Sequence, residues 1–249
     1  MHYAASRLVV LALIMACATS ALLTQSAMGG PLSMLNSLEY LRVQFTRSLY
    51  APSSTPDIVS GTMYFTPTGL VHIEITSPII QHISLTGKEM TIYYPKERKA
   101  FVFSSQNPLS LPFASAFIGA TRESMGLSDL GFSTSTISRS SDTIISTWIP
   151  PASARTSLQK VVLAELNGVV VRSESFDAKG ALSTRAVYKN YVSIKQGQVP
   201  LEIYGGWQSK NGWTRENLEF TDPSTVDALP PHVNDFKIPS DVTPRKVQW

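Results

Sequence analysis

Alternation of apolar and polar residues is the main pattern along this chain, and it predicts β-strands. Side chains alternate in this way from residue 43 to residue 50, as expected for a strand with one buried face. Similar runs follow, separated by short turns, of which Asn167-Gly168 is a strong hairpin signal. The predicted strands are residues 43–50, 58–66, 70–76, 79–85, 89–94, 99–103, 130–138, 143–149, 157–166, 169–176, 182–194, 198–206 and 212–220.

The even spacing of these strands favours an antiparallel meander or barrel over a parallel α/β sheet. Ahead of them, residues 31–41 carry leucine at every third position, which is typical of a short amphipathic helix. The sequence has no internal repeat, low-complexity tract or linker. We therefore expect a mainly β (α+β) fold, with one antiparallel sheet and its covering helices in a single domain over residues 30–249.

Residues 108–126 interrupt the strand pattern with side chains that are apolar on nearly every side of a helix. Such a helix must be buried on all sides or must cover an apolar surface. It is therefore either a core helix that packs on the sheet or a movable lid over a hydrophobic cavity. The candidate lid residues, from this helix and the earlier one, are Leu35, Leu38, Leu111, Phe113, Phe117 and Ile118.

One face of the first half of the predicted sheet is strongly apolar. Side chains two residues apart in a strand point to the same face, so Val71, Ile73 and Ile75 form one apolar row. This face is either an ordinary core or the lining of a cavity for an apolar ligand. The candidate cavity residues are Phe45, Met63, Phe65, Val71, Ile73, Ile75, Ile83, Leu85, Met90, Ile92, Phe101 and Phe103.

Residues 1–29 have the pattern of a secretory signal peptide. One cation, Arg7, precedes a stretch from Leu8 to Leu23 that is apolar or small, and small residues beyond it permit cleavage. This stretch is shorter than the roughly 20 residues of a membrane span, and a retained membrane anchor is the alternative. Residues 14–17 also approach the box that precedes a lipid-modified bacterial cysteine, so Cys17 is a candidate lipidation site.

Composition and residue spacing argue against several classes of function. Charged residues make up 16% of the chain and the net charge is +3, too weak and dispersed for binding nucleic acid. A single cysteine excludes a disulfide framework, and no two histidines have the helical spacing of a zinc pair. His72 and His82 fall opposite the apolar strand positions, and His72 and Glu74 could share a face as an acid–base pair. Solvated polar residues are the simpler interpretation, so we expect no metal, no cofactor and no catalytic residue.

From residue 43 onward the order of motifs resembles the LolA-type outer-membrane lipoprotein carriers. The similar segments are, in chain order, Val43-Gln-Phe-Thr-Arg47, Gly61-Thr-Met-Tyr-Phe-Thr-Pro67, Ser77-Pro78, Gly87-Lys88, Ile92-Tyr93-Tyr94-Pro95, Leu111-Pro-Phe113 through Ile118-Gly-Ala120, and Phe236-Lys-Ile-Pro239. The last of these is similar to a final Phe-x-x-Pro strand in the family. Two positions depart from the family pattern: Thr66 replaces an arginine that helps to fasten the lid, and Thr86 replaces an acidic residue.

The resemblance implies an incomplete β-barrel whose concave apolar face is closed by helices and receives acyl chains. It also implies the partners: acylated lipoproteins or lipids as cargo, an inner-membrane transporter that releases lipoproteins, and an outer-membrane receptor. Because Thr66 lacks the guanidinium donors of arginine, weaker fastening of the lid or a different cargo is expected.

Three functions remain open on the sequence. The leading expectation is a monomeric periplasmic carrier, without enzymatic activity, that shields acyl chains on the way to the outer membrane. The second is a receptor of the same architecture, anchored in the outer membrane through a lipid on Cys17. The third is an envelope sensor or scaffold that uses the same half-barrel to bind a protein.

Overall fold

The computed structural model of the chain describes residues 40–52, 54–66, 70–86, 88–104, 112–195 and 197–248. Its helices are α2 (Pro112–Ala120) and α3 (Pro231–Asn234), with 3-10 turns η2 (Glu123–Gly126) and η3 (Ala152–Ala154). Its strands are β1 (Tyr40–Tyr50), β2 (Asp57–Phe65), β3 (Val71–Ser77), β4 (Gln81–Thr86), β5 (Glu89–Tyr94), β6 (Lys99–Ser104), β7 (Ser133–Ser140), β8 (Thr143–Ile149), β9 (Leu158–Leu166), β10 (Val169–Asp177), β11 (Leu182–Ile194), β12 (Gly197–Ser209), β13 (Gly212–Val226) and β14 (Arg245–Gln248).

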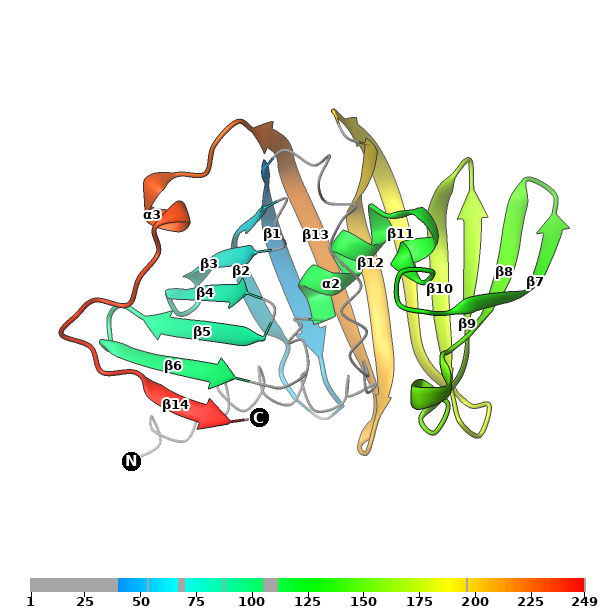
Figure 1. Cartoon of the computed structure of the whole chain (residues 1–249), viewed down its shortest axis with the longest axis horizontal. Helices are drawn as coiled ribbons and strands as arrows, with labels where there is room; N and C mark the ends of the chain where they lie inside the picture. The colour runs from blue at the N-terminus through cyan, green and yellow to red at the C-terminus, as the bar shows by residue number, and fades with distance from the viewer. Residues whose placement is uncertain are drawn as a thin grey trace.

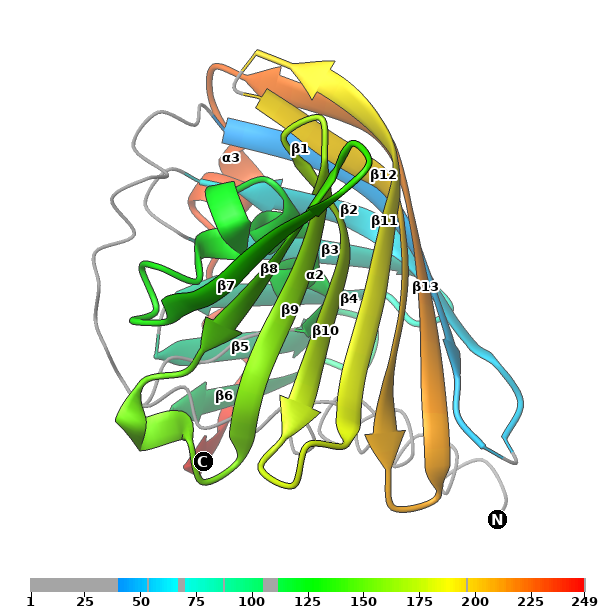
Figure 2. The same ribbon diagram turned by 90° about the vertical axis from the view of Figure 1, so that its right-hand side faces the viewer.

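The fourteen strands of the described residues belong to one sheet, in the order β14-β6-β5-β4-β3-β2-β1-β13-β12-β11-β10-β9-β8-β7. Two antiparallel meanders, β1 to β6 and β7 to β13, meet where β1 pairs with β13. The sheet curls around helix α2 and its two edges stay apart (Figures 1 and 2). The expected mainly β fold and the incomplete barrel are therefore confirmed.

The strands that the alternation predicts are present, with ends that differ by a few residues. One difference is at Leu41, which we expected at the end of a helix and which lies in β1. Leu41 pairs with Phe65 of β2 and with Thr225 of β13. Its buried side chain extends the inward row of β1, so strand pairing outweighs the three-residue leucine spacing at this point. The rest of that predicted helix lies outside the described residues.

The predicted helix at residues 108–126 is shorter in the structure. Helix α2 ends at Ala120, where the Thr121 hydroxyl donates a hydrogen bond to the carbonyl oxygen of Ile118 at 2.7 Å. Beyond it, Ser124 and Met125 have φ angles of 46° and 56°, which an α-helix cannot contain. Within the described part of the chain, no helix is long and apolar enough to cross a membrane.

The C-terminal segment runs from β13, inside the sheet, past α3 to the end of the first meander at β6 (Figure 1). Residues 236–239, which the resemblance implied to be a strand, have no strand pairing, because Phe236 packs on His72 at a ring distance of 4.9 Å instead. The last strand is β14, and it pairs with β6 in the parallel direction, Arg245 opposite Phe101. The edge of the first meander is therefore covered by the end of the chain.

A close approach of β2 and β3 requires glycine at residue 61. A Cβ atom at Gly61 would overlap the backbone carbonyl oxygen of Glu74, next to a shift in the β2–β3 register. In contrast, a Cβ atom at Gly205 of β12 would meet its nearest neighbour at 3.6 Å, an ordinary contact. The glycine that the resemblance singled out therefore has a steric reason for its position.

Candidate functional site: the concave face beneath helix α2

Apolar side chains of the first meander form continuous rows across the concave face. Residues opposite one another on neighbouring strands are in contact, and the register extends such pairs over six strands. One row is Leu41, Phe65, Val71, Leu85, Met90 and Phe103, and the next is Val43, Met63, Ile73, Ile83, Ile92 and Phe101.

All the predicted cavity residues belong to the same apolar cluster. Phe45 and Ile75 lie in it beside the two rows, on either side of Gly61 in the register. These side chains are at most 7% exposed, apart from Phe101, which is partly buried. The alternation thus assigned the correct face to each of them. A role as cavity lining remains a prediction.

Helix α2 lies on this face through aromatic side chains. The ring of Phe113 stacks on Phe45 at 5.7 Å between centroids. Phe117 is fully buried, with Phe65 at 5.5 Å and Phe220 of β13 at 4.5 Å. This packing brings Phe113 and Phe117 together over the join between the meanders. A core helix and a closed lid would both pack in this way.

The other predicted lid residues contribute less or lie outside the described part. Ile118 is partly buried and packs against the same cluster. Leu35, Leu38 and Leu111 lie outside the described residues, as do Cys17 and the predicted signal peptide.

A buried ion pair lies among these apolar side chains. The Arg47 Nε atom donates to Glu216 Oε1 at 2.5 Å, and both residues are less than 9% exposed. The guanidinium carbon of Arg47 also lies 5.5 Å from the ring centroid of Phe113 in α2. Our reading of the sequence missed this pair, although Arg47 alternates in phase with Phe45 and Leu49 and so faces the same side.

Thr66, which the resemblance aligns with a lid-fastening arginine, connects two neighbouring strands. Its backbone N–H donates to the carbonyl oxygen of Leu70, and its hydroxyl accepts from the Leu70 N–H, both at 3.0 Å. Thr66 thus joins the end of β2 to the start of β3. In this chain the guanidinium that lies against α2 comes from Arg47 of β1 instead.

The second meander adds hydroxyl groups to the core cluster. Tyr188 is 2% exposed, and its hydroxyl lies 3.1 Å from the Ser173 hydroxyl and 3.8 Å from the sulfur of Met125 in η2. Burial raises the pKa of Tyr188 to about 12, so the phenol is neutral at pH 7. The contact with Met125 links the segment after α2 to strand β11.

On the convex face, His72 and His82 lie opposite the apolar rows, as predicted. The expectation that His72 and Glu74 are solvated is wrong for His72, which is fully buried. The reason is Phe236, which covers both imidazole rings at centroid distances of 4.9 Å and 5.8 Å.

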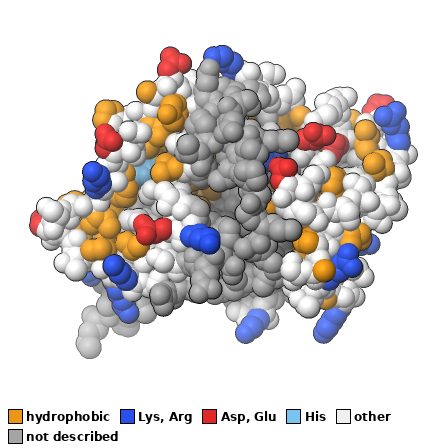
Figure 3. Space-filling model, in the orientation of Figure 1, with side chains coloured by type: hydrophobic (Ala, Val, Ile, Leu, Met, Phe, Trp, Pro, Cys, Tyr) orange, Lys and Arg blue, Asp and Glu red, His pale blue; other side chains and the backbone are white. Residues whose placement is uncertain are grey.

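The charged side chains of the described residues form no patch of one sign on the face in Figure 3. Lys, Arg, Asp and Glu are scattered over it.

No protein-family model matches this sequence, and neither does any curated protein. Among solved structures, a LolA superfamily protein from Nitrosomonas europaea aligns with a TM-score of 0.52 at 17% identity, over 84% of this chain and 96% of the other. A DUF1329 family protein from Desulfovibrio piger aligns with a TM-score of 0.58 at 12% identity, over 85% and 95% of the two chains. At these identities the comparison concerns architecture, and it agrees with the open sheet and its inner helix. The chain has a LolA-like fold.

Proposed function

We propose that this protein is an exported carrier that shields the acyl chains of lipoproteins or other lipids against the concave face of its sheet. The observation that carries the proposal is the pair of apolar rows across six strands, covered by helix α2 through Phe113 and Phe117. The LolA-like fold supports it, because proteins of the LolA type are lipoprotein carriers and not enzymes.

Energetics favour exchange of α2 for an acyl chain. Each methylene removed from water contributes about 0.8 kcal/mol, so a chain of roughly 16 carbons gains on the order of 12 kcal/mol. Lifting α2 would expose its six side chains in the apolar cluster, of which the largest, Phe113 and Phe117, cost about 1.5–3 kcal/mol each, together with the part of the sheet beneath them. An acyl chain that takes the place of α2 covers that part of the sheet again, so its gain can offset the cost of lifting the helix.

The proposed cycle needs no cofactor. The carrier would take its cargo from an inner-membrane transporter and release it to an outer-membrane receptor with higher affinity for the chains. Low charge on the concave face suits this task, because burying a charge beside an acyl chain is costly unless it is paired. Arg47 is compatible with the task because Glu216 neutralises it.

The proposal is tested by photo-crosslinking to an acyl ligand. A photoreactive phenylalanine analogue replaces Phe113 in the mature chain, which is mixed with a radiolabelled long-chain acyl probe and irradiated. The control carries the analogue at Trp213, an exposed aromatic residue of β13. We expect labelled adducts from position 113 and none from position 213. No adduct from position 113, or no binding of the probe at micromolar concentration, would overturn the proposal.

The anchored receptor differs from the carrier only at the N-terminus. An intact mass of the mature protein with a diacylglycerol adduct on Cys17 would support the receptor, whereas an unmodified shorter chain supports the carrier.

A further inference from the structure

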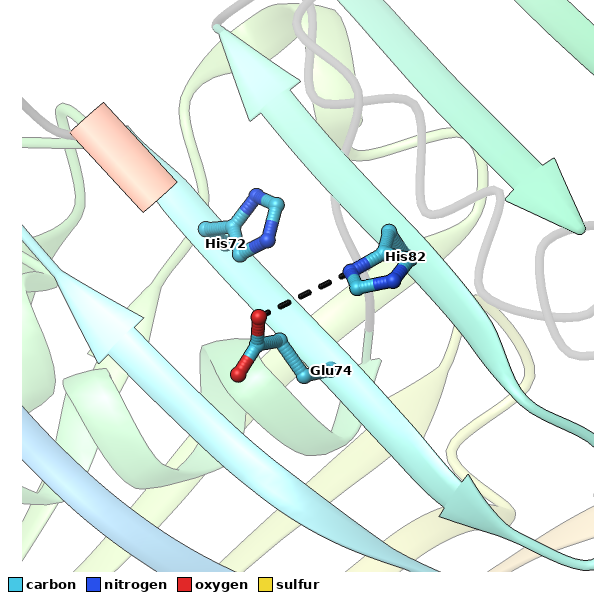
Figure 4. Close-up of side chains that lie close together, drawn as sticks. All are labelled: His72, Glu74 and His82. Carbon is cyan, nitrogen blue, oxygen red and sulfur yellow. Dashed lines mark ion pairs between the residues drawn. The ribbon is translucent and has the colours of Figure 1, made fainter. Parts of the chain in front are cut away.

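Four polar side chains with metal-ligating atoms meet on the convex face, away from the proposed acyl site. Three come from adjacent strands: His72 and Glu74 from β3, and His82 from β4, opposite Glu74 in the register. Their ligand atoms all lie within 4.8 Å of one another. Figure 4 shows the two imidazole rings side by side and the Glu74 carboxylate near both, with one of its oxygens directed toward His82.

The fourth side chain comes from the C-terminal segment. His232 of α3 places its Nε2 atom 3.0 Å from Glu74 Oε1, and the same oxygen is 3.6 Å from Nδ1 of His82. Asp241, farther along this segment, forms an ion pair with Arg98 between β5 and β6. The segment is thus held to the sheet by contacts on both sides of Phe236 in the sequence. Phe236 itself packs on the rings of His72 and His82.

His72 brings buried, unpartnered polar atoms into the cluster. Its side chain is fully buried, and neither ring nitrogen has a hydrogen-bond partner among the described residues. The Nδ1 atom of His82 is buried and has no hydrogen bond there either. A buried polar atom without a partner costs about 1–3 kcal/mol, so a ligand that accepts the nitrogen lone pairs would remove a real penalty.

We propose that His72, Glu74, His82 and His232 bind one divalent transition-metal ion, with zinc as the best fit to their chemistry. Imidazole nitrogen and a carboxylate oxygen suit zinc, and four protein ligands are the hallmark of a closed structural site. Ligand bonds of about 2.0–2.2 Å place tetrahedral donors roughly 3.3 Å apart. The separations of 3.0 Å and 3.6 Å around Glu74 Oε1 are close to that spacing.

Bound zinc would tie α3 and the C-terminal segment to β3 and β4, because His232 comes from α3 and the other three ligands come from those two strands.

The test uses the mature chain, purified with a tag that contains no histidine and treated with a chelator. Zinc is then added in a calorimetric titration, and cobalt is added in a separate sample to record the visible absorption bands of a tetrahedral site. We expect one zinc per chain, tetrahedral cobalt bands, and a melting temperature that rises with zinc. The hard cations magnesium and calcium should give none of these effects.

Variants assign the site to these residues. His82→Ala, His232→Ala and Glu74→Gln should each weaken zinc binding by more than about tenfold, since loss of outer-shell partners alone typically costs 10–100-fold. The matched controls are Asn234→Ala, exposed in α3, and Glu174→Gln, on β10, and both should bind as the wild type does. Less than one zinc per wild-type chain, or equal zinc affinity in ligand and control variants, would overturn the proposal. Circular dichroism verifies that each variant is folded, and His232→Ala, which alters an exposed side chain, is the variant least able to disturb folding.

Discussion

Truncation of Phe117 to alanine tests whether α2 is a cover that yields to cargo. Phe117 is fully buried between Phe65 and Phe220, so its ring holds α2 against both β2 and β13. Truncating a buried phenylalanine costs about 3–5 kcal/mol. If α2 must leave before an acyl chain enters, that loss weakens the closed state that competes with binding.

The expected magnitude follows from the competition. Each 1.4 kcal/mol taken from the closed state raises apparent affinity about tenfold, until the open state predominates. A loss of about 3 kcal/mol therefore raises the affinity for an acyl probe by up to about 100-fold. The increase is measured by fluorescence titration of wild type and Phe117→Ala with one long-chain probe.

The control for Phe117→Ala is Phe176→Ala. It removes the same type of side chain from β10. The Phe176 ring centroid lies 4.8 Å from Nζ of Lys160, and among the described residues the ring makes no contact with an aromatic ring of α2. Its probe affinity should equal that of the wild type. An unchanged or lower affinity in Phe117→Ala, with native circular dichroism, would refute the idea that α2 competes with cargo.

Three further predictions concern stability. Gly61→Ala should destabilise the protein by about 1–3 kcal/mol in urea unfolding because its methyl group overlaps a backbone carbonyl of β3, whereas Gly205→Ala should change stability little. Arg47→Met should cost about 3–5 kcal/mol by leaving Glu216 buried without its partner, and the double variant with Glu216→Leu should recover most of that loss in the same assay. The pKa of Tyr188 is raised from 10.0 to about 12 by burial, so the folded state favours the neutral phenol; this stabilisation is complete below pH 10 and is lost as pH rises from 10 to 12. Between pH 10 and pH 12 the free energy of unfolding should therefore fall by about 2–3 kcal/mol less in Tyr188→Phe than in the wild type. If the free energy of unfolding falls equally with pH in both proteins, the argument is contradicted.

Strand periodicity made the sheet and its apolar face predictable. In β1 every second side chain from Leu41 to Leu49 is buried, and the same alternation predicts one face for Ile73 and Ile83, which pair in the structure. The helix at residues 108–126 was predictable in kind and not in length, because the turn at Ser124 and Met125 depends on φ angles that these residues rarely adopt.

The convex-face cluster was beyond a search based on helical spacing. Its signal was nevertheless in the sequence: His72 and Glu74 alternate in phase, and a hairpin between the two strands can place His82 opposite Glu74. The position of His232 beside Glu74 could not be predicted from the sequence, because it depends on how the residues after β13 fold back over the sheet. Burial of His72 under Phe236 has the same tertiary origin.

The place where the two meanders join has a consequence for the order of folding. β1 pairs with β13, Tyr40 opposite Val226, and β14 pairs with β6, so both pairings bring together strands that are far apart in the sequence. Each meander can form early from short hairpins, whereas pairing between distant parts of a chain is slow. We therefore expect pairing of β1 with β13 to be a late step of folding, so that helix α2, which packs on Phe65 of β2 and on Phe220 of β13, reaches its final packing only after the two meanders have joined.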